Sequence, residues 1–239
     1  MNDLVIITGG SSGLGLALSK NVPFPAHVAE ISRSGGGEDF IEHIGADLAD
    51  PTTWTGVGDA IARLVEEHDP QRAVFIHAAG TLQPIGFAGE VETDDYTANV
   101  LLNSAAGQVL GHLFLDAIEG RSGQFDLVMI TSGAARSVYP GWSSYGAGKA
   151  ALDQWVRTVG AEQKERGGVR VSSIAPGVLA TAMQSLIRET AEQDFPEVAR
   201  FHALHGDGIL VEPDEAARRI WDLIERGIET GSVTDIRNP

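Results

Sequence analysis

The sequence predicts an α/β fold: a doubly wound parallel sheet in a single domain, with helices on both faces. One observation is that short apolar runs alternate with longer segments of helical periodicity along the whole chain, as in repeated strand–helix–strand units. A second is that these runs are apolar at nearly every position, as strands buried on both faces are. The 239 residues contain no repeat or linker, so we expect one domain over 1–239.

The elements follow in order along the chain. Apolar runs predict strands at Leu4–Thr8, His27–Ser32, Ala73–Ala78, Phe125–Thr131, Val169–Ala175 and Ser232–Ile236, with a further strand ending before Asp47. Helical periodicity covers Thr52–Glu67, Thr93–Glu119, Ser144–Glu165 and Pro213–Arg226. The segment 180–212 fits this alternation least, and we interpret it as a helical flap over a site.

Composition excludes several classes of function. The net charge of −16 disfavours nucleic acid and anionic membranes as partners. The absence of cysteine excludes disulfides and thiolate metal sites, and no apolar run has the length of a membrane span. His202 and His205 lack a further ligand at suitable spacing, so we expect no metal site. No signal peptide is visible before "LVIIT", and the default location is the cytoplasm.

A glycine-rich turn, "TGGSSGLG" at 8–15, directly follows the first strand and opens a helix. Gly9, Gly13 and Gly15 allow the backbone to approach a pyrophosphate, whose charge suits a helix N-terminus. The spacing is G-x-x-x-G-x-G and not the usual dinucleotide fingerprint, and a tight turn alone could explain it. Its position after the first strand of an alternating α/β chain favours nucleotide binding.

The end of the second strand, "EISRSG", indicates which dinucleotide is bound. An acidic residue at the strand tip selects NAD by accepting from ribose hydroxyls. Here the tip offers Ser32, Arg33 and Ser34, while Glu30 lies inside the strand. The planar guanidinium of an arginine can donate two hydrogen bonds to a 2′-phosphate, so we expect NADP(H). Farther on, Asp47 suits either an adenine amino group or the cap of a helix starting near Pro51.

The stretch "SSYGAGKAALDQW" places Tyr145 and Lys149 four residues apart, on one face of a predicted helix. A phenol has a pKa of about 10, and a neighbouring ammonium favours the phenolate. The pair could therefore move a proton at a substrate oxygen. Ser132 ends the fifth strand, where its hydroxyl can donate to a carbonyl oxygen. Ser137, Ser143 and Ser144 are alternatives on the loop and the helix start.

Taken together and in order, the motifs resemble the short-chain dehydrogenase/reductase family over nearly the full chain. They are "TGGSSGLG", Asp47, "HAAG" at 77–80, Asn103, Ser132, "YGAGK" at 145–149 and "PGVLAT" at 176–181. The resemblance implies a Rossmann-type sheet and hydride transfer with a nicotinamide cofactor. Within the family, "ITSGAARSVYPGWSSYGAGKAALDQW" is most similar to benzil reductases and sepiapterin reductases.

The resemblance also implies a role for each matching residue. Tyr145 is the acid/base, Lys149 holds the nicotinamide ribose and lowers the Tyr145 pKa, and Ser132 polarises the carbonyl. Asn103, preferred over Asn99, orders a water in the proton relay, and Thr181 binds the carboxamide. The expected cofactor-binding residues are Gly9, Ser11, Ser12, Gly13, Leu14, Gly15, Ser32, Arg33, Ser34, Asp47, Leu48, Ala78, Ala79, Gly80, Tyr145, Lys149, Pro176, Gly177, Val178 and Thr181.

Two departures from the family pattern concern the cofactor. His77 stands where the family usually has Asn, so a side-chain anchor could be lost. Ser12 stands where many NADP-dependent relatives have a basic residue, so selection of the 2′-phosphate rests mainly on Arg33.

The sequence therefore predicts an NADPH-dependent carbonyl reductase acting on a ketone or 1,2-diketone with an apolar or aromatic substituent. Tyr139, Trp142 and Phe195 are the expected substrate contacts, while Phe201 could simply pack the flap. Arg136 is the only cation noted near the substrate, and we interpret it as a surface residue. Alternatives are reduction of a pterin, a steroid ketone or an acyl thioester, or a non-catalytic nicotinamide-binding regulator. Small and apolar residues on helices 93–119 and 144–165 favour a homodimer.

Overall fold

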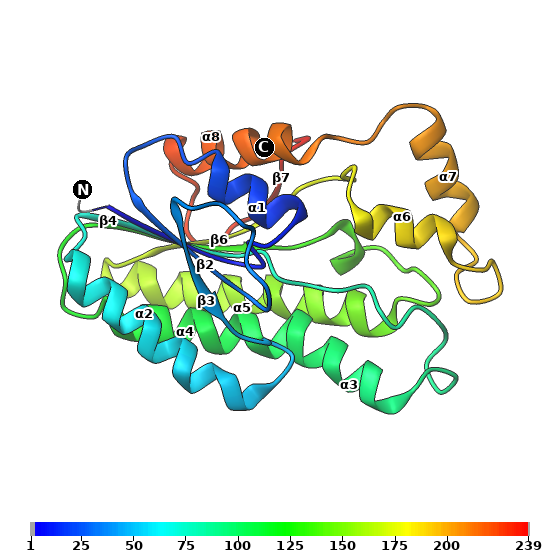
Figure 1. Ribbon diagram of the computed structural model, residues 1–239, viewed down its shortest axis with the longest axis horizontal. Coiled ribbons are helices and arrows are strands. Elements are labelled where there is room, and N and C mark those ends of the chain that lie inside the picture. The colour runs from blue at the N-terminus through cyan, green and yellow to red at the C-terminus, as the bar shows by residue number, and fades with distance from the viewer. Residues whose placement is uncertain (1–2, 239) are drawn as a thin grey trace.

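The computed structural model describes residues 3–238, so Met1, Asn2 and Pro239 lie outside the described residues. Seven parallel strands form one sheet in the order β3-β2-β1-β4-β5-β6-β7 (Figure 1). The strands are β1 (Leu4–Thr8), β2 (His27–Ser32), β3 (Ile41–Gly45), β4 (Arg72–His77), β5 (Gln124–Ile130), β6 (Arg170–Ala175) and β7 (Val233–Asp235). The chain winds outward in both directions from the β1/β4 pair, which confirms the doubly wound sheet and places a binding crevice where the winding reverses.

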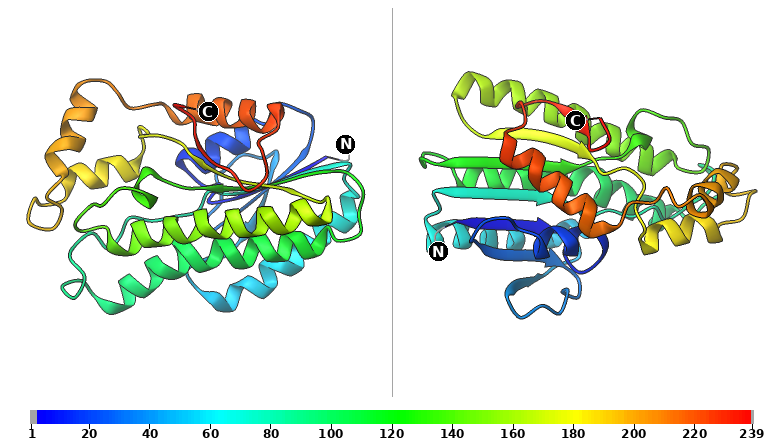
Figure 2. Two further views of the ribbon diagram at one scale, coloured as in Figure 1. Left: turned by 180° about the vertical axis from the view of Figure 1, so that it is seen from behind. Right: turned by 90° about the horizontal axis from the view of Figure 1, so that it is seen from above.

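Helices cover both faces of the sheet (Figure 2). One face carries α2 (Trp54–His68), α4 (Gly107–Ala117) and α5 (Ser143–Arg166), and the other carries α1 (Gly13–Lys20) and α8 (Pro213–Arg226). Strand side chains alternate between the two cores: Leu4 and Ile6 pack toward α2 and α4, whereas Val5 and Ile7 pack toward α1 and α8. Burial on both faces explains why the strands are so uniformly apolar.

Two elements differ from the prediction. The third strand, "IEHIG", is an edge strand whose side chains are only partly buried, so it lacks the apolar run that marks the others. The predicted helix 93–119 is continuous but contains a π-helical segment, Leu101–Ala106, between α3 (Thr93–Val100) and α4. Such segments are rare and often mark functional sites.

The apolar residues that suggested a dimer interface mostly serve the core. Ala106, Leu110, Leu152 and Val156 are fully buried against the sheet. The outer surface between α4 and α5 instead carries a shallow groove. It is lined by Gln108, His112, Leu115, Ala151, Gln154, Trp155, Thr158, Val159 and Glu162.

The segment 180–212 contains two helices, α6 (Ala182–Glu189) and α7 (Val198–Gly206), which extend beyond the carboxyl ends of the strands (Figures 1 and 2). Backbone hydrogen bonds from Ala180 to Val211 (2.9 Å) and from Val211 to Val178 (3.0 Å) close the base of this flap. A third apolar cluster joins the flap to the loop before α5. Among residues 3–238, none of the helices has the length and apolarity to cross a bilayer.

Candidate active site

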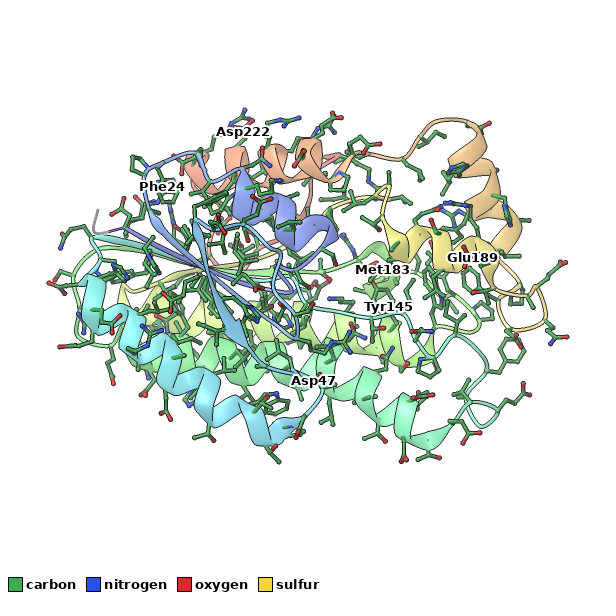
Figure 3. The ribbon with its side chains drawn as sticks, viewed as in Figure 1. Phe24, Asp47, Tyr145, Met183, Glu189 and Asp222 are labelled. Carbon is green, nitrogen blue, oxygen red and sulfur yellow. The ribbon has the colours of Figure 1, made fainter. Side chains whose placement is uncertain are left out.

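A cavity of 1180 Å³ opens at the carboxyl ends of the strands, between the sheet and the flap. Residues at the carboxyl ends of five different strands line it, among them Gly9, Ser32, Ala78, Ser132 and Pro176. Tyr145 of α5, Met183 of the flap and Asp47 all line this cavity, and Figure 3 labels each of them. Parallel strands all end at this edge, so the topology brings together motifs that are far apart in sequence.

The glycine-rich turn forms one wall of the cavity, and its glycines are required by close backbone contacts. A Cβ added at Gly9, where φ is +74°, would lie 2.8 Å from Ala79 Cα, and one added at Gly15 would lie 2.1 Å from the Gly9 carbonyl oxygen. Gly13 has a φ of +52° at the start of α1. Because no side chain of residue 12 caps this helix, its first N–H groups remain available beside the cavity. This arrangement fits a pyrophosphate.

The end of β2 places Arg33 on the cavity and Glu30 away from it. Arg33 is exposed and lines the cavity. Glu30 is buried, where its carboxylate contacts the His43 ring and accepts a hydrogen bond from the Ser32 hydroxyl at 3.2 Å. The Ser32 hydroxyl accepts in turn from the Gly35 N–H at 3.1 Å, which holds the loop after the strand. Ser34 alone among the expected cofactor contacts does not line the cavity; it is exposed.

The two interpretations of Asp47 are separated by the structure. Asp50, not Asp47, caps the short helical turn that begins at Pro51, accepting from the Thr52 N–H at 2.9 Å. Asp47 accepts from the Ala49 N–H at 3.0 Å, is exposed and lines the cavity. The helix-capping interpretation of Asp47 is therefore wrong, and a contact with a ligand stays a prediction.

Ser132, Tyr145 and Lys149 converge on the same cavity. Ser132 follows β5 and its hydroxyl accepts from the Ala134 N–H at 3.1 Å, which fixes the side chain at the strand end. Tyr145 and Lys149 lie one turn apart near the start of α5, and both are more than nine-tenths buried. The Lys149 ammonium donates to the Ile130 carbonyl at 2.9 Å and lies 5.9 Å from the centre of the Tyr145 ring.

Burial dominates the electrostatics of this cluster. It raises the pKa of the Tyr145 phenol, and the hydrogen bond with Ser132 lowers it only in part. Burial also lowers the pKa of Lys149 to about 8, against the attraction of Asp153 one turn further along α5. In this structure the Lys149 ammonium donates to the Ile130 carbonyl, and burial outweighs the other influences on the pKa of Tyr145. The expectation that Lys149 lowers the Tyr145 pKa stays a prediction.

Asn103 does not line the cavity; it lies fully buried in the π-helical segment behind it. Its side-chain amide donates to the Thr81 carbonyl (2.7 Å) and to Asn99 Oδ1 (3.0 Å), and its Oδ1 accepts from the Thr81 N–H (3.1 Å). Asn99 adds a bond to the Gln83 carbonyl at 2.8 Å. The two residues considered as alternatives therefore act together, as a clamp on the loop after β4.

His77, in place of the usual Asn, retains an anchoring role. It is fully buried, and its Nδ1 lies 2.9 Å from the Thr8 hydroxyl, which also accepts from the Ala79 N–H at 3.1 Å. Burial and the Lys149 ammonium lower the pKa of His77 to about 3, so the ring is neutral. The side-chain anchor thought to be lost is therefore present, and it ties the end of β4 to the end of β1.

The loop after β6 closes the cavity from the other side. Pro176, Gly177, Val178 and Thr181 all line it. A Cβ added at Gly13 would lie 3.6 Å from Thr181 Cγ2, so this loop faces the glycine-rich turn directly. The two segments form opposite walls, as the predicted dinucleotide contacts require.

At the flap end, Tyr139 and Trp142 line the cavity as predicted, but Phe195 does not. Phe195 is fully buried and stacks on the far side of Trp142, with ring centroids 4.5 Å apart and planes 12° apart. Phe201, interpreted from the sequence as possible packing, does line the cavity. The expected substrate contact of Phe195 is therefore corrected: it supports Trp142, because the flap inserts it into the third apolar cluster.

Two cations at the flap end were missed. Arg200 of α7 and Arg237 near the C-terminus both line the cavity, whereas Arg136 is exposed outside it. Their approach depends on how the flap and the last strand fold back, which no local pattern announces. The only sequence signal was that Arg200 immediately precedes Phe201 in the segment predicted to cover the site.

Comparison with known proteins agrees with this geometry. Residues 3–192 match the family model described as short chain dehydrogenase. The chain is similar to a benzil reductase ((S)-benzoin forming) of Bacillus subtilis, with 35% identity covering 98% of each chain. It is also similar to the sepiapterin reductase of Mus musculus, with 31% identity covering 92% of this chain and 91% of the relative. The crystal structure of the KRED1-Pglu enzyme superposes with a TM-score of 0.81 and 26% identity, covering 97% of this chain and 99% of that one.

Proposed function

Because this chain belongs to the short-chain dehydrogenase family of oxidoreductases, we propose that it is an NADPH-dependent carbonyl reductase. Its substrate is a ketone or 1,2-diketone with an apolar, aromatic substituent, and one carbonyl is reduced to an alcohol, which gives a hydroxyketone when the substrate is a diketone. The observation that carries the proposal is the convergence of Ser132, Tyr145 and Lys149 on a cavity whose other half is walled by the glycine-rich turn. A non-catalytic nicotinamide-binding regulator would need only that second half.

Proton donation is assigned to Tyr145. Its raised pKa keeps the phenol protonated at neutral pH, as a proton donor in carbonyl reduction must be. Ser132 donates a hydrogen bond to the same carbonyl oxygen and stabilises the negative charge that develops there. Both residues line the cavity, and Tyr145 packs in the third apolar cluster, where such bonds are stronger than in water. Bound NADPH supplies the hydride that the carbonyl carbon accepts.

The cofactor proposal rests on the distribution of charge around the cavity. Arg33 is exposed at the tip of β2, where its planar fork suits a 2′-phosphate. Glu30, the acidic residue that would favour NAD, is buried and engaged by His43 and Ser32. Lys149 and Thr181 both line the cavity, where Lys149 would hold the nicotinamide ribose and Thr181 the carboxamide. Asn103 would order a water through its backbone, since its side chain is already engaged.

The substrate proposal rests on the aromatic rings beside Tyr145. Trp142 packs edge-on against Tyr145, with centroids 5.7 Å apart, and Tyr139 lies 4.9 Å from Trp142. With Phe201 these rings form an apolar wall suited to a flat group. A second carbonyl next to the first withdraws electrons, so a diketone should accept hydride faster than the matching monoketone. The activity in the name of the Bacillus subtilis relative is of this kind.

We also propose that two copies associate through the outer faces of α4 and α5, and that the enzyme works in the cytoplasm. The groove between these helices carries Leu115 and Trp155, apolar side chains that a second copy would cover.

Oxidation of NADPH with benzil, deoxybenzoin and 2-oxoglutarate tests the proposed function. We expect benzil to react fastest, and Tyr145→Phe to lose nearly all turnover while NADPH still binds, because Phe keeps the ring and lacks the proton. Ser132→Ala should cost about 2.7–4 kcal/mol in transition-state stabilisation. If benzil is not reduced, the proposed substrate class is wrong. Normal turnover by Tyr145→Phe would refute the mechanism.

A further inference from the structure

Positive charge gathers at the flap end of the cavity, although the chain as a whole carries −16. Arg200 and Arg237 both line this end. The Arg237 guanidinium is balanced by Asp235, to which it donates two hydrogen bonds of 2.8 and 2.6 Å. Arg200 makes no ion pair with any carboxylate in residues 3–238. At this end of the cavity, Arg200 therefore presents a guanidinium whose charge no described carboxylate balances.

Arg200 is coupled to Tyr139. Its guanidinium donates to the Tyr139 hydroxyl oxygen at 3.3 Å and lies 5.7 Å from the ring centroid. Because that oxygen accepts from Arg200, the phenolic proton is left to donate elsewhere, and none of the described side chains accepts it. The remaining guanidinium N–H groups likewise have no protein acceptor among the described residues. The Tyr139 hydroxyl and the Arg200 guanidinium thus present several unpartnered donors to this corner, which suits an anion.

The position of this corner relative to the reacting group limits what can bind there. Trp142 lies between Tyr139 and Tyr145, with centroids 4.9 Å from the first and 5.7 Å from the second. A group held by Arg200 and Tyr139 is therefore separated from the carbonyl at Tyr145 by roughly the span of one aromatic ring.

We propose that the substrate is an aryl ketone or diketone that carries a carboxylate at the end remote from the reacting carbonyl, and that Arg200 and Tyr139 bind this carboxylate. The inference rests on the proposed function, because it takes Tyr145 as the place where the carbonyl lies. The ring spans the aromatic wall, and the carboxylate fills the corner where donors are in excess. A neutral diketone uses the same wall but leaves these donors to water.

The test uses a matched pair of substrates, benzil-4-carboxylate and its methyl ester, with NADPH and the full-length protein. The quantity measured is kcat/KM for the acid divided by kcat/KM for the ester. Comparing this ratio between variants cancels the difference in intrinsic reactivity of the two compounds. We expect Arg200→Gln to lower the ratio about tenfold, mainly through KM of the acid, since one charge-assisted contact at an exposed site is lost. Arg200→Lys, which keeps the charge, should restore part of it.

Arg136→Gln is the matched control. It removes the same charge from the neighbouring loop, but at an exposed position outside the cavity. Its ratio should stay within about twofold of the starting value, because the Arg136 side chain does not line the cavity, and water, salt and nearby Asp235 screen its charge. Equal ratios for Arg200→Gln and the starting protein would overturn the proposal and leave Arg200 as a packing partner of Tyr139. An equal fall of the acid-to-ester ratio in Arg136→Gln would also overturn the proposal, because the preference for the acid would then come from the general positive charge near the cavity.

The two proposals fail in different ways. If the starting protein reduces benzil and the ester but Arg200→Gln leaves the ratio unchanged, the carboxylate site is wrong and the reductase assignment stands. If the starting protein reduces none of the three compounds with NADPH, the proposed function itself is wrong.

Discussion

Lys149 holds a positive charge in a nearly dry environment, and this sets a pH limit on the site. Burial lowers its pKa from 10.5 to about 8, so the ammonium is present below that pH and is lost above it. If Lys149 holds the nicotinamide ribose, the dissociation constant of NADPH should rise several-fold as pH increases from about 7 to about 9.5. Titration of NADPH fluorescence at each pH measures this.

Lys149→Arg provides the control for that pH dependence, because a guanidinium stays charged throughout the range. Its NADPH affinity should be flat with pH even if weaker overall. Titration of Lys149 does not unfold the starting protein at high pH, so unfolding does not explain a loss of its NADPH affinity. In the unfolded chain this amine titrates near 10.5, so between the two pKa values only the folded group is neutral, and its contribution to stability rises with pH. If the NADPH affinity of Lys149→Arg falls with pH as that of the starting protein does, Lys149 does not hold the nicotinamide ribose.

We propose that the choice between NADPH and NADH depends on Arg33. Arg33→Ala should raise the Michaelis constant for NADPH about tenfold, because it removes a charge-assisted bond to the 2′-phosphate at an exposed site. NADH lacks that phosphate, so its Michaelis constant should barely change. Steady-state kinetics with both cofactors decide the matter. Equal losses, or a preference of the starting protein for NADH, would assign selectivity to another group.

At the scale of elements, the π-helical segment and the loop after β4 form one unit. Asn103 is the central residue of this unit, because its amide bonds both the N–H and the carbonyl of Thr81. Asn103→Ala should lower the free energy of unfolding by about 2 kcal/mol, since it leaves buried groups unpaired. Ser104→Ala in the same segment, which is only partly buried, should cost less than about 0.5 kcal/mol. Urea denaturation of both variants compares them, and equal costs would show that the clamp is not what stabilises the loop.

At the scale of the whole molecule, the sheet is covered by helices on both faces, and the outer surface of α4 and α5 is left with a shallow groove. If that surface joins two copies, Thr158→Arg should convert a dimer to a monomer, because it places a long cation beside its own symmetry mate. Thr55→Arg, an equal change at an exposed position of α2, should leave the dimer intact. Light scattering at micromolar concentration measures the oligomeric state of both variants. A starting protein that is already monomeric would contradict the dimer.

The sequence alone determined the architecture and the candidate reactive residues. Parallel strands buried on both faces must be largely apolar, which made β1, β2, β4, β5 and β6 visible as apolar runs. The edge strand β7 was predicted in the same way, although it is only partly buried. The glycine-rich turn and the Tyr145–Lys149 pair are local patterns, because their geometry is set within one turn or one helix. Ser132 could be placed beside them because strand ends meet at one edge.

Only the tertiary structure decided what surrounds those residues. Phe195 and Phe201 both belong to the flap. Which of the two rings lines the cavity depends on how the flap packs on Trp142. The pKa of Tyr145 depends on burial by elements distant in sequence, so the sign of its shift could not be derived from the spacing to Lys149. Arg200 approaches the site because α7 folds back over it, and such long-range contacts leave no periodic trace in the chain. Local chemistry is encoded locally, whereas the shape and charge of the substrate corner arise from packing.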